Sequence, residues 1–276
     1  MRRMLLSALT LGLVLATATG CTSSQLPRLG LPTPRDQQGK IVLFIWQSSW
    51  IAALAVGALV WGLILWSVYF HRRSRTKIEV PTQFRYNMPV EALFTVVPLI
   101  MVSVFFFYTA RDESTLLNNN QPQVHINVVG FQWSWAFNYN HVVNPRQQSS
   151  TAGPQTGAYD VGTPEALPTL WLPEGEKVEF ELTSRDVIHG FWPVDFLMKM
   201  DVIPGVVNRF SVTPTELGTF RGKCTELCGV DHSQMLFNVK VVTPAQFQAH
   251  LVALRAKGQS GFVPAGITTT GVDNAK

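Results

Sequence analysis

The residues best suited to bind a metal stand close together in the stretch Lys223-Cys-Thr-Glu-Leu-Cys-Gly-Val-Asp-His-Ser-Gln-Met235. This stretch supplies two thiolates, an imidazole and a thioether, and His189 offers a second imidazole at the end of an earlier strand-like segment. Soft sulfur ligands combined with imidazole favour copper over hard cations. The thioether also argues against zinc, because structural zinc sites use thiolate, imidazole or carboxylate ligands. The pattern therefore predicts a copper site.

The spacing of the cysteines indicates how many ions this site holds. A single-copper blue site uses one cysteine, two histidines and a weak axial methionine. Here a second cysteine follows four residues after the first, so both sulfurs can bridge two copper ions. His189 and His232 would be the terminal ligands, with Met235 and a backbone carbonyl, that of Glu226, as weak axial ligands. Such a site leaves no open position for a substrate, which predicts electron transfer.

Cys224 and Cys228 also have a simpler interpretation, a structural disulfide in an oxidising compartment. His232 would then be a surface residue, and Met235 would fill a gap in the core. The coincidence of all the ligand types at one loop favours copper over this alternative.

The aromatic stretch Gly130-Phe-Gln-Trp-Ser-Trp-Ala-Phe-Asn-Tyr139 is a second functional candidate. Trp133 and Trp135 are two residues apart, so they are predicted to share one face of a strand. Core packing is the expected role of Trp135. An exposed Trp133 near the metal loop would be a point of electron entry, with core packing as its alternative.

Two long apolar segments are expected to hold this site at a membrane. Residues 41–70 contain no charged side chain, and roughly 20 apolar residues suffice to cross a bilayer. A second apolar segment, at 90–110, contains Pro98, which membrane helices tolerate. The polar residues Arg111 to Glu113 are expected to end it. The two segments predict a transmembrane hairpin over residues 41–110.

The connection between these segments is basic, with His71, Arg72, Arg73, Arg75, Lys77 and Arg85. Short basic loops stay in the cytoplasm, which places both chain ends outside the cell membrane.

Residues 1–20 predict the same orientation. Arg2 and Arg3 precede an apolar run and small residues, the layout of a secretory signal peptide. The segment Ala18-Thr-Gly-Cys21 resembles a bacterial lipobox, so Cys21 is predicted to carry a lipid anchor at the start of an extracytoplasmic segment, 21–40. An ordinary cleavage site beside an incidental cysteine is the alternative.

Glu91 lies at the predicted cytoplasmic start of the second span. An ionisable group at membrane depth suggests a function. A carboxylate at a helix N-terminus is also favoured by the helix dipole alone, so position does not decide between the two interpretations.

Residues 111–257 are predicted to form an all-β extracytoplasmic domain. Apolar and polar residues alternate from Val124 to Val128 and in 177–183, and 206–212 and 235–242 are further strand candidates. The stretch 144–168, rich in Gln, Ser, Thr, Gly and Pro, is expected to be an exposed insertion.

Thr243 and Pro244 predict a C-terminal helix with Thr as its N-cap and Pro in its first position. Phe247, Leu251 and Leu254 would pack on the sandwich. The tail 258–276 has no periodicity and is predicted to be disordered. No basic run alternates with aromatic residues, so a nucleic-acid partner is not expected.

The hairpin, the Gln-Trp-x-Trp segment, the segment Lys199-Met-Asp-Val-Ile-Pro-Gly205 and the copper motif together resemble cytochrome c oxidase subunit II, the CuA-bearing subunit of haem–copper oxidases. The resemblance spans residues 40–257. It implies an α+β membrane protein, with a transmembrane hairpin followed by an all-β cupredoxin-like barrel or sandwich. It implies a two-copper CuA centre with these ligands: His189, Cys224, Glu226 (by its carbonyl), Cys228, His232 and Met235.

The resemblance implies three further roles. The carboxylate of Glu226 matches a contribution to a magnesium site shared with subunit I. Trp133 matches the electron-entry tryptophan. Glu91, in Glu-Ala-Leu-Phe-Thr, is similar to the glutamate of the family's E-x-x-W-T at the mouth of a proton channel, although Phe94 replaces the tryptophan.

The function implied by the resemblance is that of subunit II in a bacterial cell membrane, of the lipoprotein type. A c-type cytochrome would give electrons to Trp133 and the dicopper centre, which would reduce haem in subunit I, where oxygen is reduced and protons are pumped. This chain lacks a pair of intramembrane histidines for haem, so the oxygen chemistry belongs to another subunit. A quinol-oxidase subunit II, which lacks the copper ligands, and a membrane-tethered copper chaperone are the alternatives.

Overall fold

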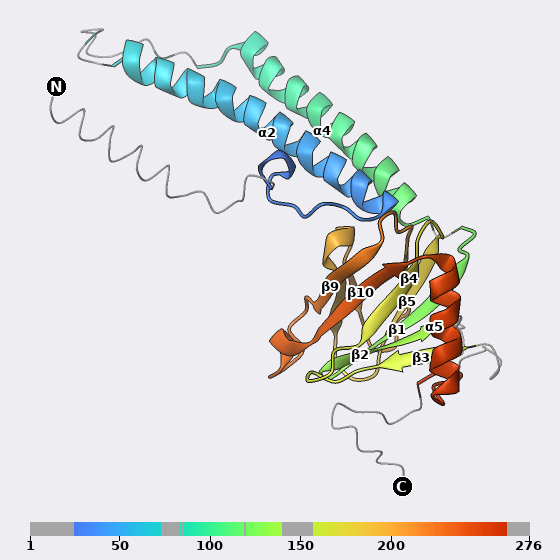
Figure 1. Cartoon of the computed structure of the whole chain (residues 1–276). Coiled ribbons are helices and arrows are strands. Elements are labelled where there is room, and N and C mark those ends of the chain that lie inside the picture. The colour runs from blue at the N-terminus through green and yellow to red at the C-terminus, as the bar shows by residue number, and fades with distance from the viewer. Residues whose placement is uncertain are drawn as a thin grey trace, which may run out of the picture.

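The computed structural model describes residues 25–72, 75, 83, 85–118, 120–139 and 157–263. Two long helices, α2 (Gln37–Phe70) and α4 (Met88–Leu116), lie side by side and lead to a β-sandwich flanked by helix α5 (Pro244–Ala256) (Figure 1). The predicted fold class, a helical hairpin followed by an all-β domain with a C-terminal helix, is confirmed. The predicted signal peptide and Cys21 lie outside the described residues.

Both long helices have the length and composition needed to cross a membrane. The side chain of Asp36 caps α2 by accepting a hydrogen bond from the Gly39 N–H, and the Asn87 side chain caps α4. Helix α4 continues past Arg111 to Glu113, the polar residues that end its apolar segment, as far as Leu116. Polar side chains end an apolar span, but they do not break the backbone hydrogen bonds of a helix.

The β-sandwich consists of two five-stranded sheets with the orders β3-β2-β1-β5-β8 and β4-β10-β9-β6-β7. The strands of the first sheet are β1 (Val124–Phe131), β2 (Ser134–Tyr139), β3 (Ala158–Val161), β5 (Val178–Ser184) and β8 (Asn208–Val212). Those of the second are β4 (Thr169–Pro173), β6 (His189–Pro193), β7 (Met200–Val202), β9 (Gly218–Cys224) and β10 (Leu236–Val242). Three short 3-10 helices are also described: η1 (Leu26–Arg28), η2 (Val194–Phe196) and η3 (His232–Gln234).

The space between the sheets is filled by aromatic side chains. Trp135, Phe191 and Phe237 are all buried, and the rings of Phe191 and Phe237 stack with centroids 5.0 Å apart. Helix α5 packs against this core through Phe247, Leu251 and Leu254, and Thr243 forms a capping box with Gln246, as the C-terminal helix prediction required. This packing gives the metal loop a rigid support.

Strand β1 differs from the half-buried alternation predicted for Val124 to Val128, because almost every residue in β1, and in its partner β2, is buried. The outer face of these strands carries a second small core that contains Val129, Phe131, Ala136 and Val263. Part of the predicted exposed insertion, Ala158–Val161, is strand β3 and pairs with β2.

The predicted disordered tail likewise begins as ordered chain. Ser260 forms a bridge with Ala158, and the Val263 N–H donates a hydrogen bond to the buried side chain of Asn138. Both differences have the same cause. Segments of polar composition cover the edge and the outer face of β2, and their sequences do not indicate that they pair with or pack on a strand.

Candidate metal centre

The predicted ligands meet where two neighbouring strands of the second sheet adjoin one loop. Strand β9 ends at Cys224, and β6 begins at His189, rather than ending there as the sequence suggested. The Cys224 N–H donates to the carbonyl of Met235, and the Thr225 N–H donates to that of Gly190. A Cβ at Gly190 would lie 2.1 Å from Oγ1 of Thr225, so glycine is what lets the loop lie this close to β6.

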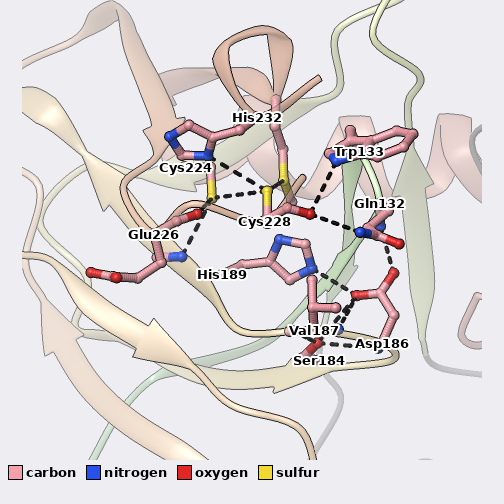
Figure 2. Close-up of polar contacts among 12 residues, drawn as sticks. Gln132, Trp133, Ser184, Asp186, Val187, His189, Cys224, Glu226, Cys228 and His232 are labelled. Atoms are coloured by element: carbon pink, nitrogen blue, oxygen red, sulfur yellow. Dashed lines mark hydrogen bonds and ion pairs between the residues drawn. The ribbon is translucent and has the colours of Figure 1, made fainter. Parts of the chain in front are cut away.

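The sulfur atoms lie at the centre of this arrangement (Figure 2). The Sγ atoms of Cys224 and Cys228 are 3.8 Å apart, and both cysteines are buried free thiols. A disulfide requires sulfurs about 2.05 Å apart, so the structure does not contain the alternative disulfide. Nδ1 of His232 lies 3.5 Å from Sγ of Cys228, and Sδ of Met235 lies 3.7 Å from the same sulfur.

His189 faces the sulfurs from β6, and its side chain is fully buried. Its Nε2 lies 2.8 Å from Oδ1 of Asp186, whereas Nδ1 is buried without a hydrogen-bond partner. The possible ligand atoms of His189, Cys224 and Cys228 all lie within 4.8 Å of one another. A buried, unpaired nitrogen beside two thiols fits a metal site, because an unsatisfied buried polar atom otherwise destabilises the fold.

The two thiols have different acidities in the metal-free protein. Burial opposes ionisation of Cys224, but the neighbouring His189 imidazole and the hydrogen bond from the Gly190 N–H outweigh it and lower its pKa to about 7. Burial and the neighbouring charge of Cys224 raise the pKa of Cys228. The pKa of His189 is also raised: burial lowers it, but the neighbouring Cys224 sulfur and the Asp186 carboxylate have the larger combined effect. Metal-free protein therefore holds one thiolate readily and the second only with difficulty.

Glu226 contributes two groups that point in different directions. Its backbone carbonyl oxygen lies 3.3 Å from Sγ of Cys224. Its carboxylate extends away from the sulfurs, as Figure 2 shows, and the residue is half-buried. Of these two groups, only the backbone carbonyl faces the sulfur cluster.

Trp133 lies beside the cluster but not on a strand, so the prediction that it shares a strand face with Trp135 is wrong. It occupies the turn between β1 and β2, is half-buried, and its indole N–H donates to the carbonyl of Cys228 at 3.2 Å. Trp135 is fully buried in β2, and its indole N–H donates to the carbonyl of Met235, which confirms its core role.

Glu91 has no contact with the cluster. It lies in the first turn of α4, which begins at the end of the hairpin away from the β-sandwich (Figure 1). Its carboxylate accepts a hydrogen bond from the backbone N–H of Asn87 at 3.0 Å. The described contact is thus a helix cap, the alternative that the helix dipole suggested.

Two side chains that support the site were missed in the sequence. Asp186 accepts hydrogen bonds from the backbone N–H of Gln132 at 2.6 Å and of Val187 at 2.7 Å, in addition to its contact with His189. The Gln132 side-chain amide donates to the carbonyl of Cys228 at 2.7 Å. The available signal for Asp186 was its position three residues before the predicted ligand His189, because such partners often orient the ring of a ligand histidine.

Comparison of this chain with known proteins identifies its family. A profile described as "Cytochrome C oxidase subunit II, periplasmic domain" matches residues 124–242. A protein of Streptomyces avermitilis named "Probable cytochrome c oxidase subunit 2" is 60% identical, over 98% of this chain and 92% of that protein. The chain belongs to the cytochrome c oxidase subunit II family.

Other members of the family are more distant. The cytochrome c oxidase subunit 2 of Mycobacterium tuberculosis is 36% identical, over 90% of this chain and 81% of that protein. Among solved structures, the periplasmic domain of subunit II of cytochrome oxidase of Bradyrhizobium japonicum has a TM-score of 0.42 and 24% identity, covering 50% of this chain and 96% of that one.

Proposed function

We propose that this chain is the electron-accepting subunit of a cytochrome c oxidase, which takes electrons from a c-type cytochrome and passes them to haem in subunit I. Oxygen reduction and proton pumping would take place in the partner subunits. The observation that supports this most is the meeting of two free buried thiols with the unpaired Nδ1 of His189. Family membership supports it independently.

The proposed CuA ligands are His189, Cys224, Glu226 through its carbonyl, Cys228, His232 and Met235. When bound there, a pair of copper ions would supply a one-electron redox centre. The protein's part is to hold the donors in place before the metal arrives. The Asp186 carboxylate accepts a hydrogen bond from the Nε2–H of His189, so the lone pair of Nδ1 is left on the side of the ring that faces the sulfurs.

Trp133 is the proposed entry point for electrons. Its indole N–H donates a hydrogen bond to the backbone carbonyl of Cys228, and the residue remains partly exposed. Gly229 keeps this approach open, since a Cβ there would lie 2.9 Å from the indole nitrogen. Trp133→Ala should therefore slow reduction by a cytochrome while the copper content stays unchanged.

The proposed membrane arrangement has both chain ends outside the cell and a lipid on Cys21. The start of α2 is bound directly to the β-sandwich: Asp36 pairs with Pro214, and the Gln37 N–H donates to the carbonyl of Thr213. Such contacts support placing the start of the first span and the β-sandwich on one side of the membrane.

Two finer roles are also proposed. The carboxylate of Glu226 would bind a magnesium ion shared with subunit I, supported by its orientation away from the sulfurs. Glu91 would lie at the mouth of a proton channel in subunit I, in addition to capping α4.

The decisive experiment measures copper in the purified full-length chain, together with its electron paramagnetic resonance spectrum. Two coppers per chain with one unpaired electron shared between both nuclei would support the proposal. His189→Gln should abolish the shared-electron signal, whereas the matched control His125→Gln, on β1, should not. A single, reversibly bound copper without that signal would refute the proposal and favour a copper chaperone.

A further inference from the structure

An open cavity of about 450 Å³ lies between the two long helices, at the end of the hairpin nearest the β-sandwich. Its walls are formed by the first turns of α2 and the last turns of α4. These two helix ends lie side by side next to the sandwich (Figure 1). The lining residues are Lys40, Ile41, Phe44, Arg111, Asp112 and Thr115. This cavity is called the interfacial groove below.

The rim of the interfacial groove carries an excess of positive charge. Nε and Nη2 of Arg111 both donate to Oδ1 of Asp112, at 2.9 and 2.8 Å. The Asp112 side chain is only 8% exposed, whereas that of Arg111 is 55% exposed. The guanidinium is thus fixed by its partner and still open to an anion. Lys40 forms no ion pair with any residue that the structure describes, although the buried carboxyl of Asp36, outside the lining, lies near enough to interact with it. The lining residues therefore comprise two cations and one carboxylate.

The other wall of the groove is apolar. Phe44 lies one helical turn after Lys40 on the same face of α2, and it is 62% exposed. Ile41 lies beside it. Outside the lining, Trp46 and Trp50 of α2 pack edge to face at 5.7 Å, and the guanidinium of Arg111 lies 5.0 Å from the ring centre of Tyr108. Aromatic residues of this kind collect where a membrane meets water.

We propose that the interfacial groove binds an anionic phospholipid. Its phosphate would lie between the Lys40 ammonium and the open edge of the Arg111 guanidinium, and an acyl chain would extend along Ile41 and Phe44. A cation rim above an apolar wall matches both parts of such a molecule, and the net charge of the rim favours an anionic over a zwitterionic head group. The proposal requires only that α2 and α4 cross a bilayer, and it is independent of copper.

Native mass spectrometry of the full-length chain, titrated with phosphatidylglycerol in detergent, tests the site. One bound lipid should dissociate about fivefold more readily in Lys40→Gln, because each cation near a membrane surface contributes roughly this factor. The matched control is Arg85→Gln, which removes an exposed cation before α4 at the opposite end of the hairpin. This control should bind phosphatidylglycerol like the unchanged chain.

Arg111 needs a separate design, because removing it alone would leave the buried Asp112 carboxylate unpaired. The double variant Arg111→Gln with Asp112→Asn keeps a neutral amide pair in its place. It should bind phosphatidylglycerol more weakly than the unchanged chain, because the guanidinium contact to the phosphate is lost, but the loss should be smaller than in Lys40→Gln, because the net charge of the lining is unchanged. Thermal stability should not change.

Two comparisons in the same titration distinguish the source of the phosphate. Phosphatidylcholine with identical acyl chains should bind the unchanged chain about fivefold more weakly than phosphatidylglycerol. Inorganic phosphate at the same concentration should not displace the lipid. Equal binding of both lipids, displacement by inorganic phosphate, or unchanged binding in Lys40→Gln would each overturn the proposal.

Discussion

Replacing Asp186 with Asn tests whether the metal ligands are held in place before copper binds. The carboxylate accepts hydrogen bonds from three groups, His189 Nε2–H and the backbone N–H groups of Gln132 and Val187, at 2.6 to 2.8 Å. An amide has only one acceptor oxygen, and its NH2 group would face one of these three donors. Asp186→Asn therefore removes at least one charge-assisted hydrogen bond and leaves a donor without an acceptor.

The expected loss in unfolding free energy is about 2 kcal/mol, because a hydrogen bond to a charged group contributes roughly 1.5–3 kcal/mol. For a domain of this size, that corresponds to a fall in melting temperature of about 4–8 °C. The copper affinity should fall about 10- to 100-fold, the usual effect of losing the partner of a ligand histidine.

The assay is thermal unfolding of the metal-free full-length chain, followed by copper titration against a competing chelator. Asp201→Asn, which changes an exposed acid on β7, is the matched control and should leave both values unchanged. If Asp186→Asn keeps the copper affinity of the unchanged chain, the carboxylate does not orient His189 and the reasoning is refuted.

Three further predictions concern acidity and packing. Iodoacetamide should modify Cys224 of the metal-free protein before Cys228, because the pKa of Cys224 is lowered to about 7. Peptide mass spectrometry should find a half-maximal rate of modification near pH 7, and a half-maximum near pH 9 would contradict this. Burial, followed by Lys257 and Lys240, lowers the pKa of His250 to about 4. Its neutral form thus adds stability above the unfolded pKa of about 6.5, and this contribution is lost as the pH falls from there toward 4. His250→Phe should therefore show a smaller loss of melting temperature over that range, and an equal loss would count against the assignment. Leu251→Ala should lower the unfolding free energy by about 2–5 kcal/mol in chemical denaturation, whereas Val252→Ala, at an exposed position of the same helix, should have little effect.

The sequence by itself determined the parts of this protein whose signals are local. Four of the proposed ligand side chains lie between Cys224 and Met235, so their chemistry could be read without knowing how the chain folds. The two long helices followed from length and apolarity alone, since a bilayer sets both. The C-terminal helix followed from Thr243 and Pro244, because capping depends only on neighbouring residues.

The tertiary structure alone decided how distant segments meet. It placed Trp133 in a turn against the Cys228 carbonyl and brought Asp186 into contact with both His189 and Gln132. It also paired β3 with the edge of β2 and placed the start of the tail on the outer face of β2. It also made Cys224 the more acidic of two chemically identical thiols. These features depend on hydrogen bonds and burial between residues far apart in the chain, and local periodicity and spacing carry no information about such contacts.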